Sequence, residues 1–294
     1  MPGGSGQVKP GVIALRPLRV GEILDGALAT IRRHPVHMLG VAAIVVLVSQ
    51  VLISVATYPL LDNLRDTAAI TPSSPPAEVN RFLQVRVAYD GISALIALPS
   101  RVLLAGLLTI VIGKAVLGQP LERGELWARV RPRLLALLAV SLIYPAITVG
   151  AAVVIYGLTL AGSSLSVLVI LVAIPVALWL YILFSFATPA LMLENAPVAR
   201  AFGRSRTLVR GSWWRVFGIQ LLAALIALVV GVVLSFPFQV GDNLALGTLG
   251  AIVAGTLTEP FAAAVTVLVY TDQRMRRERM DLDLARAAGR PPLH

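Results

Sequence analysis

VFGIQLLAALIALVVGVVLSF, residues 216–236, is an almost wholly apolar stretch that contains no charged side chain. As a helix rising about 1.5 Å per residue, it would be about 30 Å long, which matches the hydrocarbon core of a membrane. Six stretches of this kind, Val216–Phe236 included, are expected to be transmembrane helices. The other five are Leu39–Tyr58, Ile92–Gly113, Leu134–Leu158, Leu165–Ala187 and Leu249–Tyr270. The sequence therefore predicts an all-α, polytopic membrane helix bundle with six transmembrane helices.

The composition supports a membrane protein and excludes several kinds of site. Apolar residues make up 57% of the 294 residues and charged residues 14%, whereas soluble domains are about 45–50% apolar. The chain has no cysteine, which excludes disulfides, thiolate metal sites and cysteine nucleophiles. The net charge of +10 comes from basic residues at the ends of the apolar stretches. Such residues mark membrane loops, so we expect no nucleic-acid partner.

The basic residues are concentrated in alternate connections, which predicts the orientation of the chain. One side of the predicted membrane holds 21 Lys and Arg residues, and the other holds Arg65, Arg81 and Arg86. Basic loops stay in the cytoplasm, so both termini are expected there, in a multi-pass protein of the plasma membrane. The only sizeable outer loop is expected at Leu61–Gln84.

The chain is expected to divide into three parts. Residues 1–15 are predicted to be a disordered tail, residues 16–275 a single six-span membrane domain, and residues 276–294 a basic cytoplasmic tail. Kinked spans are expected, because most of the apolar stretches contain a proline. These prolines are Pro99, Pro145, Pro175 and Pro260.

A basic segment precedes each pair of spans, which suggests three units of interfacial helix plus helical hairpin. The segments are Val20–Ile31, the shorter Leu121–Val130, and Val198–Val209, for which Asn195 is the expected N-cap. Apolar residues recur at helical spacing in the first and third, so we expect three basic amphipathic helices lying on the inner leaflet. The third is predicted to bind anionic membrane lipids, or other membrane or cytoplasmic proteins. Its proposed surface consists of Arg200, Arg204, Arg206, Arg210, Trp213 and Trp214.

Two charged residues lie inside predicted spans, where charge is costly and often functional. Arg101 lies 13 residues before Lys114, and Glu259 lies 13 residues before Asp272, both markers of the inner ends of their spans. Equal offsets place Arg101 and Glu259 at the same depth, on helix faces rich in small residues. We therefore expect a buried ion pair, which either locks two helices together or belongs to a working site.

The sequence contains no recognisable catalytic, cofactor or metal motif. His34, His37 and His294 are expected in the cytoplasm, whereas Ser163 and Ser164 are expected outside, so these residues cannot form a hydrolase triad. His34 and His37 lack the neighbouring carboxylates of a zinc site. No phosphate-binding loop or dinucleotide fingerprint occurs. We therefore expect no enzyme activity, no cofactor and no metal.

Three stretches resemble a known family. They are RPLRVGEILDG (residues 16–26), AFGRSRTLVRGSWWR (residues 201–215) and LVYTDQRMRRERMDL (residues 268–282). In these motifs the chain resembles actinobacterial membrane proteins of the glycerophosphoryl diester phosphodiesterase membrane domain-like family. The resemblance implies a membrane domain without the hydrolase activity, because the soluble catalytic barrel and its acidic residues have no counterpart here.

Two functions remain open from the sequence. The first is a non-catalytic membrane scaffold or accessory subunit that acts through its basic cytoplasmic-face helices. The second is a transporter or lipid-handling protein that uses an intramembrane site at Arg101 and Glu259. A polar cavity around that pair would favour the second function, and a tightly packed bundle would favour the first.

Overall fold

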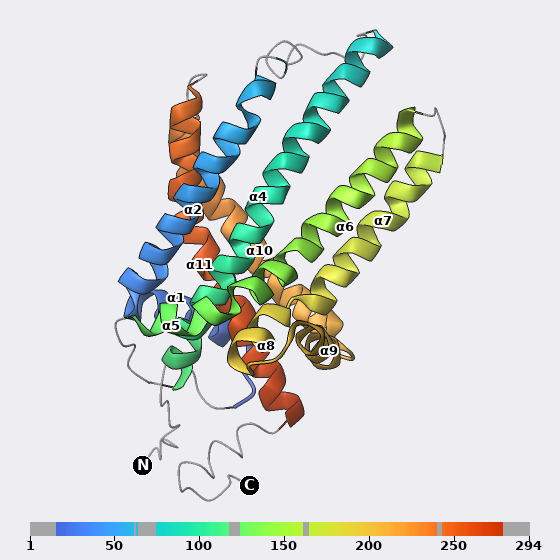
Figure 1. The fold of residues 1–294 in the computed structure, drawn as a ribbon. Helices are drawn as coiled ribbons and strands as arrows, with labels where there is room; N and C mark the ends of the chain where they lie inside the picture. The colour runs from blue at the N-terminus through green and yellow to red at the C-terminus, as the bar shows by residue number, and fades with distance from the viewer. Residues whose placement is uncertain are drawn as a thin grey trace, which may run out of the picture.

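The computed structural model describes residues 16–61, 63, 75–117, 124–160, 165–239 and 243–278, and the regular structure within these ranges is helical (Figure 1). The long helices are α2 (Pro35–Thr57), α4 (Pro76–Leu117), α6 (Leu134–Leu160), α7 (Leu165–Phe184), α10 (Trp213–Ser235) and α11 (Leu244–Glu278). The shorter helices are α1 (Val20–Arg33), α5 (Glu125–Val130), α8 (Ala187–Leu193) and α9 (Val198–Val209). Single 3₁₀ turns are η1 (Tyr58–Leu60), η2 (Arg131–Arg133) and η3 (Phe236–Phe238).

Several helices are long and apolar enough to cross a membrane, as the composition predicted. Within the described ranges there are five such segments: Pro35–Leu60, Pro76–Val116, Leu171–Leu193, Trp213–Phe238 and Ala245–Glu278. The remaining predicted span, Leu134–Leu158, coincides with α6. The structure therefore confirms an all-helical protein with several helices of membrane-spanning length.

The helix α4 is much longer than the predicted span. It has 42 residues, about 60 Å at about 1.5 Å per residue, or twice the thickness of a hydrocarbon core. It begins at Pro76, so the outer loop expected at Leu61–Gln84 ends sooner than predicted. Proline favours the first position of a helix, because its missing N–H would have no partner there. Of that expected loop, residues 62 and 64–74 lie outside the described part of the chain.

Two prolines interrupt the helical backbone hydrogen bonds close to the charged residues of the spans. Pro99 lies inside α4, next but one to Arg101, and Pro260 lies inside α11, next to Glu259. A proline within a helix leaves the carbonyl group four residues earlier without its helical N–H donor. A third proline, Pro175, lies inside α7.

The densest packing lies at one end of the bundle, which we call the basic end. It comprises α1, α5, α8, α9 and the last turns of α11, and it lies at the bottom of Figure 1. Large side chains there are almost fully buried, among them Leu18, Phe186, Leu208 and Tyr270. The opposite end, the far end, carries η1, the start of α4 and η3. Burial of apolar surface therefore holds the helices together mainly at the basic end.

The short helices α1 and α9 turn their apolar faces toward other helices of the chain. Ile23 and Ala27 of α1 are fully buried, and α1 packs on α11 and α2. Ala201 and Leu208 of α9 are buried where α9 meets α7, α8 and α11. The sequence predicts that both faces lie on lipid. An apolar stripe is equally satisfied by protein, and here protein covers it.

Two further predictions for the basic segments differ from the structure. The middle segment, predicted at Leu121–Val130, forms only the short α5, and residues 118–123 lie outside the described ranges. Asn195 does not cap α9, because the residue that precedes its first turn is Pro197. Asn195 instead adopts a left-handed conformation with φ of 54° in the connection from α8 to α9. Asparagine tolerates that conformation better than most residues do.

Candidate functional site: a basic pocket and an ion pair between helices

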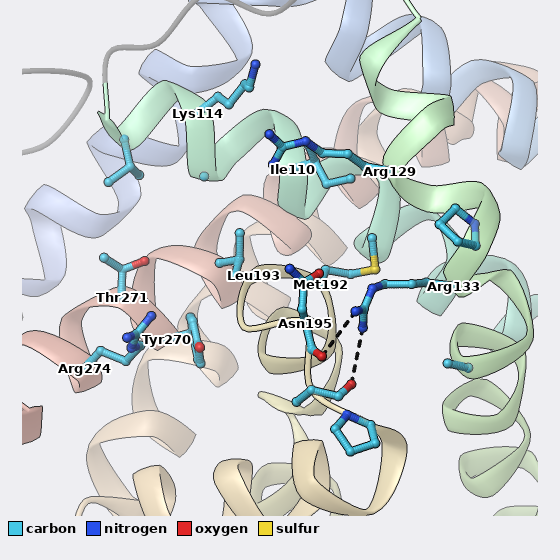
Figure 2. Close-up of a pocket in the computed structure, with 16 residues that line it drawn as sticks. Ile110, Lys114, Arg129, Arg133, Met192, Leu193, Asn195, Tyr270, Thr271 and Arg274 are labelled. Carbon is cyan, nitrogen blue, oxygen red and sulfur yellow. Dashed lines mark hydrogen bonds between the residues drawn. The ribbon is translucent and has the colours of Figure 1, made fainter.

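A large pocket opens at the basic end, between α4, the α5–η2 segment, the α8–α9 connection and α11. Its volume is about 1280 Å³. Its described lining includes no Asp or Glu. Figure 2 shows basic side chains on several sides of it, around Leu193 and Asn195. These basic residues are Lys114, Arg129, Arg133 and Arg274.

Arg133 holds one wall of the pocket in place. Its guanidinium group donates hydrogen bonds to the carbonyl oxygens of Leu191 at 3.1 Å, Asn195 at 3.2 Å and Ala196 at 3.4 Å (dashed in part in Figure 2). The last carbonyls of a helix have no partner within the helix, and a cation there also complements the helix dipole. Arg133 therefore fixes the end of α8 against the start of α6.

Arg274 forms the opposite wall and also contacts acidic residues behind it. Its Nε lies 3.0 Å from Glu278 Oε2 and 3.7 Å from Glu194 Oε1. Its guanidinium carbon lies 5.8 Å from the centre of the Tyr270 ring. Arg274 thus connects the basic pocket to an ion-pair network.

That network ties the α8–α9 connection to α9 and α11. Arg204 donates to both carboxylate oxygens of Glu194 at 2.8 Å, and it also forms a close ion pair with Glu278. The Tyr270 hydroxyl donates to Glu194 Oε1 at 2.5 Å. Burial alone would raise the pKa of Glu194, but the hydrogen bonds from Arg204 and Tyr270 lower it. The same carboxylates raise the pKa of Arg204.

The predicted lipid or partner surface on α9 is therefore only partly available. Arg200, Arg206 and Arg210 are exposed, whereas Arg204 faces the ion-pair network and is half-buried. Helical periodicity explains the difference, because Arg204 lies close to the buried face of α9, which contains Ala201, Ser205 and Leu208. At the start of α10, Trp214 is 77% exposed. Trp213 is half-buried and stacks on Phe217, with ring centres 5.1 Å apart.

A second network, centred on Asp272, joins three distant parts of the chain. The Asp272 side chain is fully buried and accepts a hydrogen bond from the Leu18 amide at 2.8 Å. Arg276 Nε lies 2.9 Å and Arg215 Nη2 3.1 Å from its carboxylate oxygens. Both arginines also donate to the Leu18 carbonyl, at 3.0 Å and 2.8 Å respectively. A buried carboxylate is stable only when it is paired in this way.

Sequence reasoning missed this junction, although a signal for it was present. Leu18, Arg215 and Asp272 each lie in a different one of the three stretches that carried the family resemblance. The structure brings these three stretches together at one place. In the sequence, Asp272 is followed closely by Arg274, Arg276 and Arg277, and this acidic residue beside several arginines could have pointed to an ion-pair junction.

The predicted pair of Arg101 and Glu259 is present in the structure, but it is not enclosed. Arg101 Nε lies 2.8 Å from Glu259 Oε1, while 61% of the Arg101 side chain and 23% of the Glu259 side chain are exposed. The two side chains separate two hollows. A smaller one of about 210 Å³ lies between α2, α4 and α11, and a larger one of about 790 Å³ lies on the other side. The expectation of a buried pair was therefore wrong, since the neighbouring helices leave the charges accessible.

Among the residues that the structure describes, no group of three or more His, Asp or Glu side chains could hold a metal ion. His294, Ser163 and Ser164 lie outside the described ranges.

The fold and the site together place this protein in a structural class. It is a helical protein with several membrane-length helices and a basic pocket at one end of the bundle. Residues 18–273 match the family model described as Domain of unknown function (DUF7847). The chain belongs to this family. The matched region begins at Leu18 and includes Asp272, so it contains the junction between them. No curated protein and no solved structure matches the chain.

Proposed function

We propose that this protein is a non-catalytic lipid-binding protein of the plasma membrane. It crosses the membrane six times, with α6 as the sixth span, and keeps both termini and the basic end in the cytoplasm. Its pocket at the basic end binds the phosphate-bearing headgroup of an anionic phospholipid. The membrane-length helices and the bias of Lys and Arg support the topology.

The observation that carries the headgroup proposal is the charge of the pocket lining. Lys114, Arg129, Arg133 and Arg274 come from three separate segments, namely α4, the α5–η2 segment and α11. They surround one hollow, and no acidic side chain belongs to its described lining. Basic pockets between helices on the cytoplasmic side suit phosphate headgroups, and each basic residue near an anionic membrane surface contributes about 1 kcal/mol. The volume of about 1280 Å³ exceeds the roughly 300–1,000 Å³ of most small-molecule sites. An entire headgroup therefore fits.

The test compares two variants with equal charge changes. Lys114→Gln with Arg129→Gln removes two charges from the pocket, and Arg200→Gln with Arg206→Gln removes two exposed charges from α9. Native mass spectrometry of protein purified in mild detergent measures retained phosphatidylglycerol and cardiolipin. We expect loss of bound lipid in the pocket variant only. Competition by inorganic phosphate separates binding of any phosphate from binding of a lipid. Equal retention in both variants would overturn the proposal.

A scaffold or accessory role is the second candidate, favoured by the exposed part of α9. Arg200, Arg206 and Arg210 together with Trp214 form a basic and aromatic surface at the basic end. Such a surface fits anionic lipid or an acidic protein partner. If the α9 variant rather than the pocket variant loses co-purifying lipid or protein, this role replaces headgroup binding in the pocket.

The proposed topology has its own test. Reporter fusions after Thr71 should report the outside, and fusions after Arg123, Arg204 and Arg286 the inside. The reason is that the positive-inside rule acts on the short basic loops that flank the spans. A cytoplasmic signal from the fusion after Thr71 would contradict the model.

A further inference from the structure

The larger hollow beside Arg101 and Glu259 is a groove along the side of the bundle. It lies between α4 and α7 on one side and α10 and α11 on the other. Its walls are open to the surroundings, since Tyr181, Leu228 and Val232 line it and are 53%, 60% and 55% exposed. In a membrane, such a groove is accessible from the lipid.

The groove is long enough to connect the two membrane surfaces. Along α11 its lining extends from Gly247 to Val267, which is about 30 Å at about 1.5 Å per residue. The hydrocarbon core has the same thickness of about 30 Å. The lining includes Gln239 near the far end and Thr188 toward the basic end. The ion pair of Arg101 and Glu259 lies between these two ends.

The exposure of Arg101 determines what can fill the groove. More than half of its side chain, 61%, is exposed, and a charged residue at the centre of a membrane is unfavourable against hydrocarbon. Lipid tails alone therefore cannot fill the groove at this depth. Water or a polar group must occupy it, and the paired charges offer a cation to an anionic group and a carboxylate to a cationic group.

We propose that this groove moves phospholipid headgroups between the two leaflets of the membrane, with the tails remaining in the surrounding lipid. The phosphate passes Arg101, the polar or ammonium part of the headgroup passes Glu259, and the opening of the ion pair lets the headgroup through. The inference rests on the six-span topology proposed above, but not on lipid binding in the basic pocket.

The test is a lipid-translocation assay with the full chain in proteoliposomes. Vesicles of phosphatidylcholine and phosphatidylglycerol contain a trace of either lipid labelled with the fluorophore NBD on an acyl chain, and external dithionite bleaches label that reaches the outer leaflet. The protein should allow bleaching of label that starts in the inner leaflet, for both lipids. Protein-containing vesicles that bleach only the outer-leaflet label, like empty vesicles, would overturn the proposal.

Two variants and one control address the mechanism. Arg101→Met with Glu259→Leu removes both charges without leaving one unpaired, and we expect translocation to slow by about tenfold or more. Ala224→Phe places a bulky side chain in the groove at an exposed position, whereas the neighbouring Leu225→Phe changes an exposed residue outside its lining. Ala224→Phe should slow translocation, and Leu225→Phe should not. Unchanged rates in the double variant and in Ala224→Phe would overturn the groove as the route.

The two proposals fail separately. The variant Lys114→Gln with Arg129→Gln should lose bound lipid in the mass spectrometer and still translocate lipid through the groove. Normal lipid retention in this variant contradicts headgroup binding in the basic pocket and leaves the groove proposal standing.

Discussion

The two ends of the bundle are stabilised in different ways. At the basic end, buried charged and polar groups link segments far apart in the sequence, as Asp272 does with Leu18 and Arg215. Toward the far end, α10 and η3 present an apolar surface, with Val229, Val233 and Phe236 each more than 60% exposed. Contacts within the protein hold the basic end together, whereas the exposed apolar surface of the far half is suited to contact with lipid. The effect of a substitution should therefore depend on the end at which it is made.

The largest effect is expected at Asp272. Asp272→Asn removes the charge that pairs with Arg215 and Arg276 in a fully buried position. Breaking a buried ion pair on one side costs about 3–5 kcal/mol, because the other charge is left uncompensated. Thermal unfolding in one detergent measures the loss. The control is Asp90→Asn, which breaks the exposed Arg86–Asp90 pair on α4 and should cost about 0–1 kcal/mol. Equal losses of stability in Asp272→Asn and Asp90→Asn would contradict the contrast between the two ends.

The next effect is expected at Glu194 and depends on pH. Glu194→Gln weakens the bonds to Arg204 and Tyr270 and should cost about 1–3 kcal/mol at pH 7. Because folding lowers the pKa of Glu194 from its ordinary 4.5, its contribution is complete above that value and is lost as the pH falls through the lowered pKa. Unfolding scans from pH 7 to pH 3 should therefore show the wild type approaching the variant only at the acidic end. A stability difference between wild type and variant that stays constant from pH 7 to pH 3 would contradict the assignment of this pH dependence to Glu194.

A smaller effect is expected at the ion pair in the middle of the bundle. Arg101→Met and Glu259→Leu should each cost about 1–2 kcal/mol, less than a buried pair, since the Arg101 side chain is 61% exposed. The double variant should recover part of the loss, with a coupling energy of about 0.5–2 kcal/mol. Thermal unfolding of the wild type, the two single variants and the double variant in one detergent measures this coupling energy. Strict additivity would show that the two charges do not interact.

The smallest effect is expected on the apolar surface of α10. Val233→Ala changes a residue that is 65% exposed and should alter stability by less than about 0.5 kcal/mol in detergent. Its matched counterpart is Val209→Ala, at a fully buried position in the last turn of α9. This change should cost about 1–3 kcal/mol through the cavity that it leaves. A similar cost for both variants would mean that the far half is packed against something besides detergent or lipid.

The features that sequence predicted well depend on short-range patterns. Apolar runs of membrane length follow from local composition, so helices such as α2 and α10 could be placed without a structure. The pairing of Arg101 with Glu259 could also be predicted, because equal offsets from Lys114 and Asp272, the charged residues at the inner ends of the two predicted spans, place both at the same depth. The exposure of the two side chains could not be predicted, since it depends on how far α4 and α7 stand from α10 and α11 across the groove.

The basic pocket and the Asp272 junction were out of reach for a different reason. Leu18 and Asp272 are separated by 254 positions in the chain, and the side chains that line the pocket come from helices with no sequence relation to one another. The faces of α1 and α9 show the same limit. Periodicity identifies Ile23 and Leu208 as apolar-face residues, but it does not determine whether lipid or protein covers them.

The prolines beside the ion pair have a mechanical consequence. Pro99 and Pro260 leave the carbonyl groups of Leu95 and Thr256 without helical donors, so α4 and α11 are both weakened near the depth at which Arg101 meets Glu259. A helix bends most easily at such a position. Each of the two helices is thus easiest to bend beside its charged residue, and a bend at either proline would change the distance between the charges. Separation of the pair would then accompany flexing of α4 and α11.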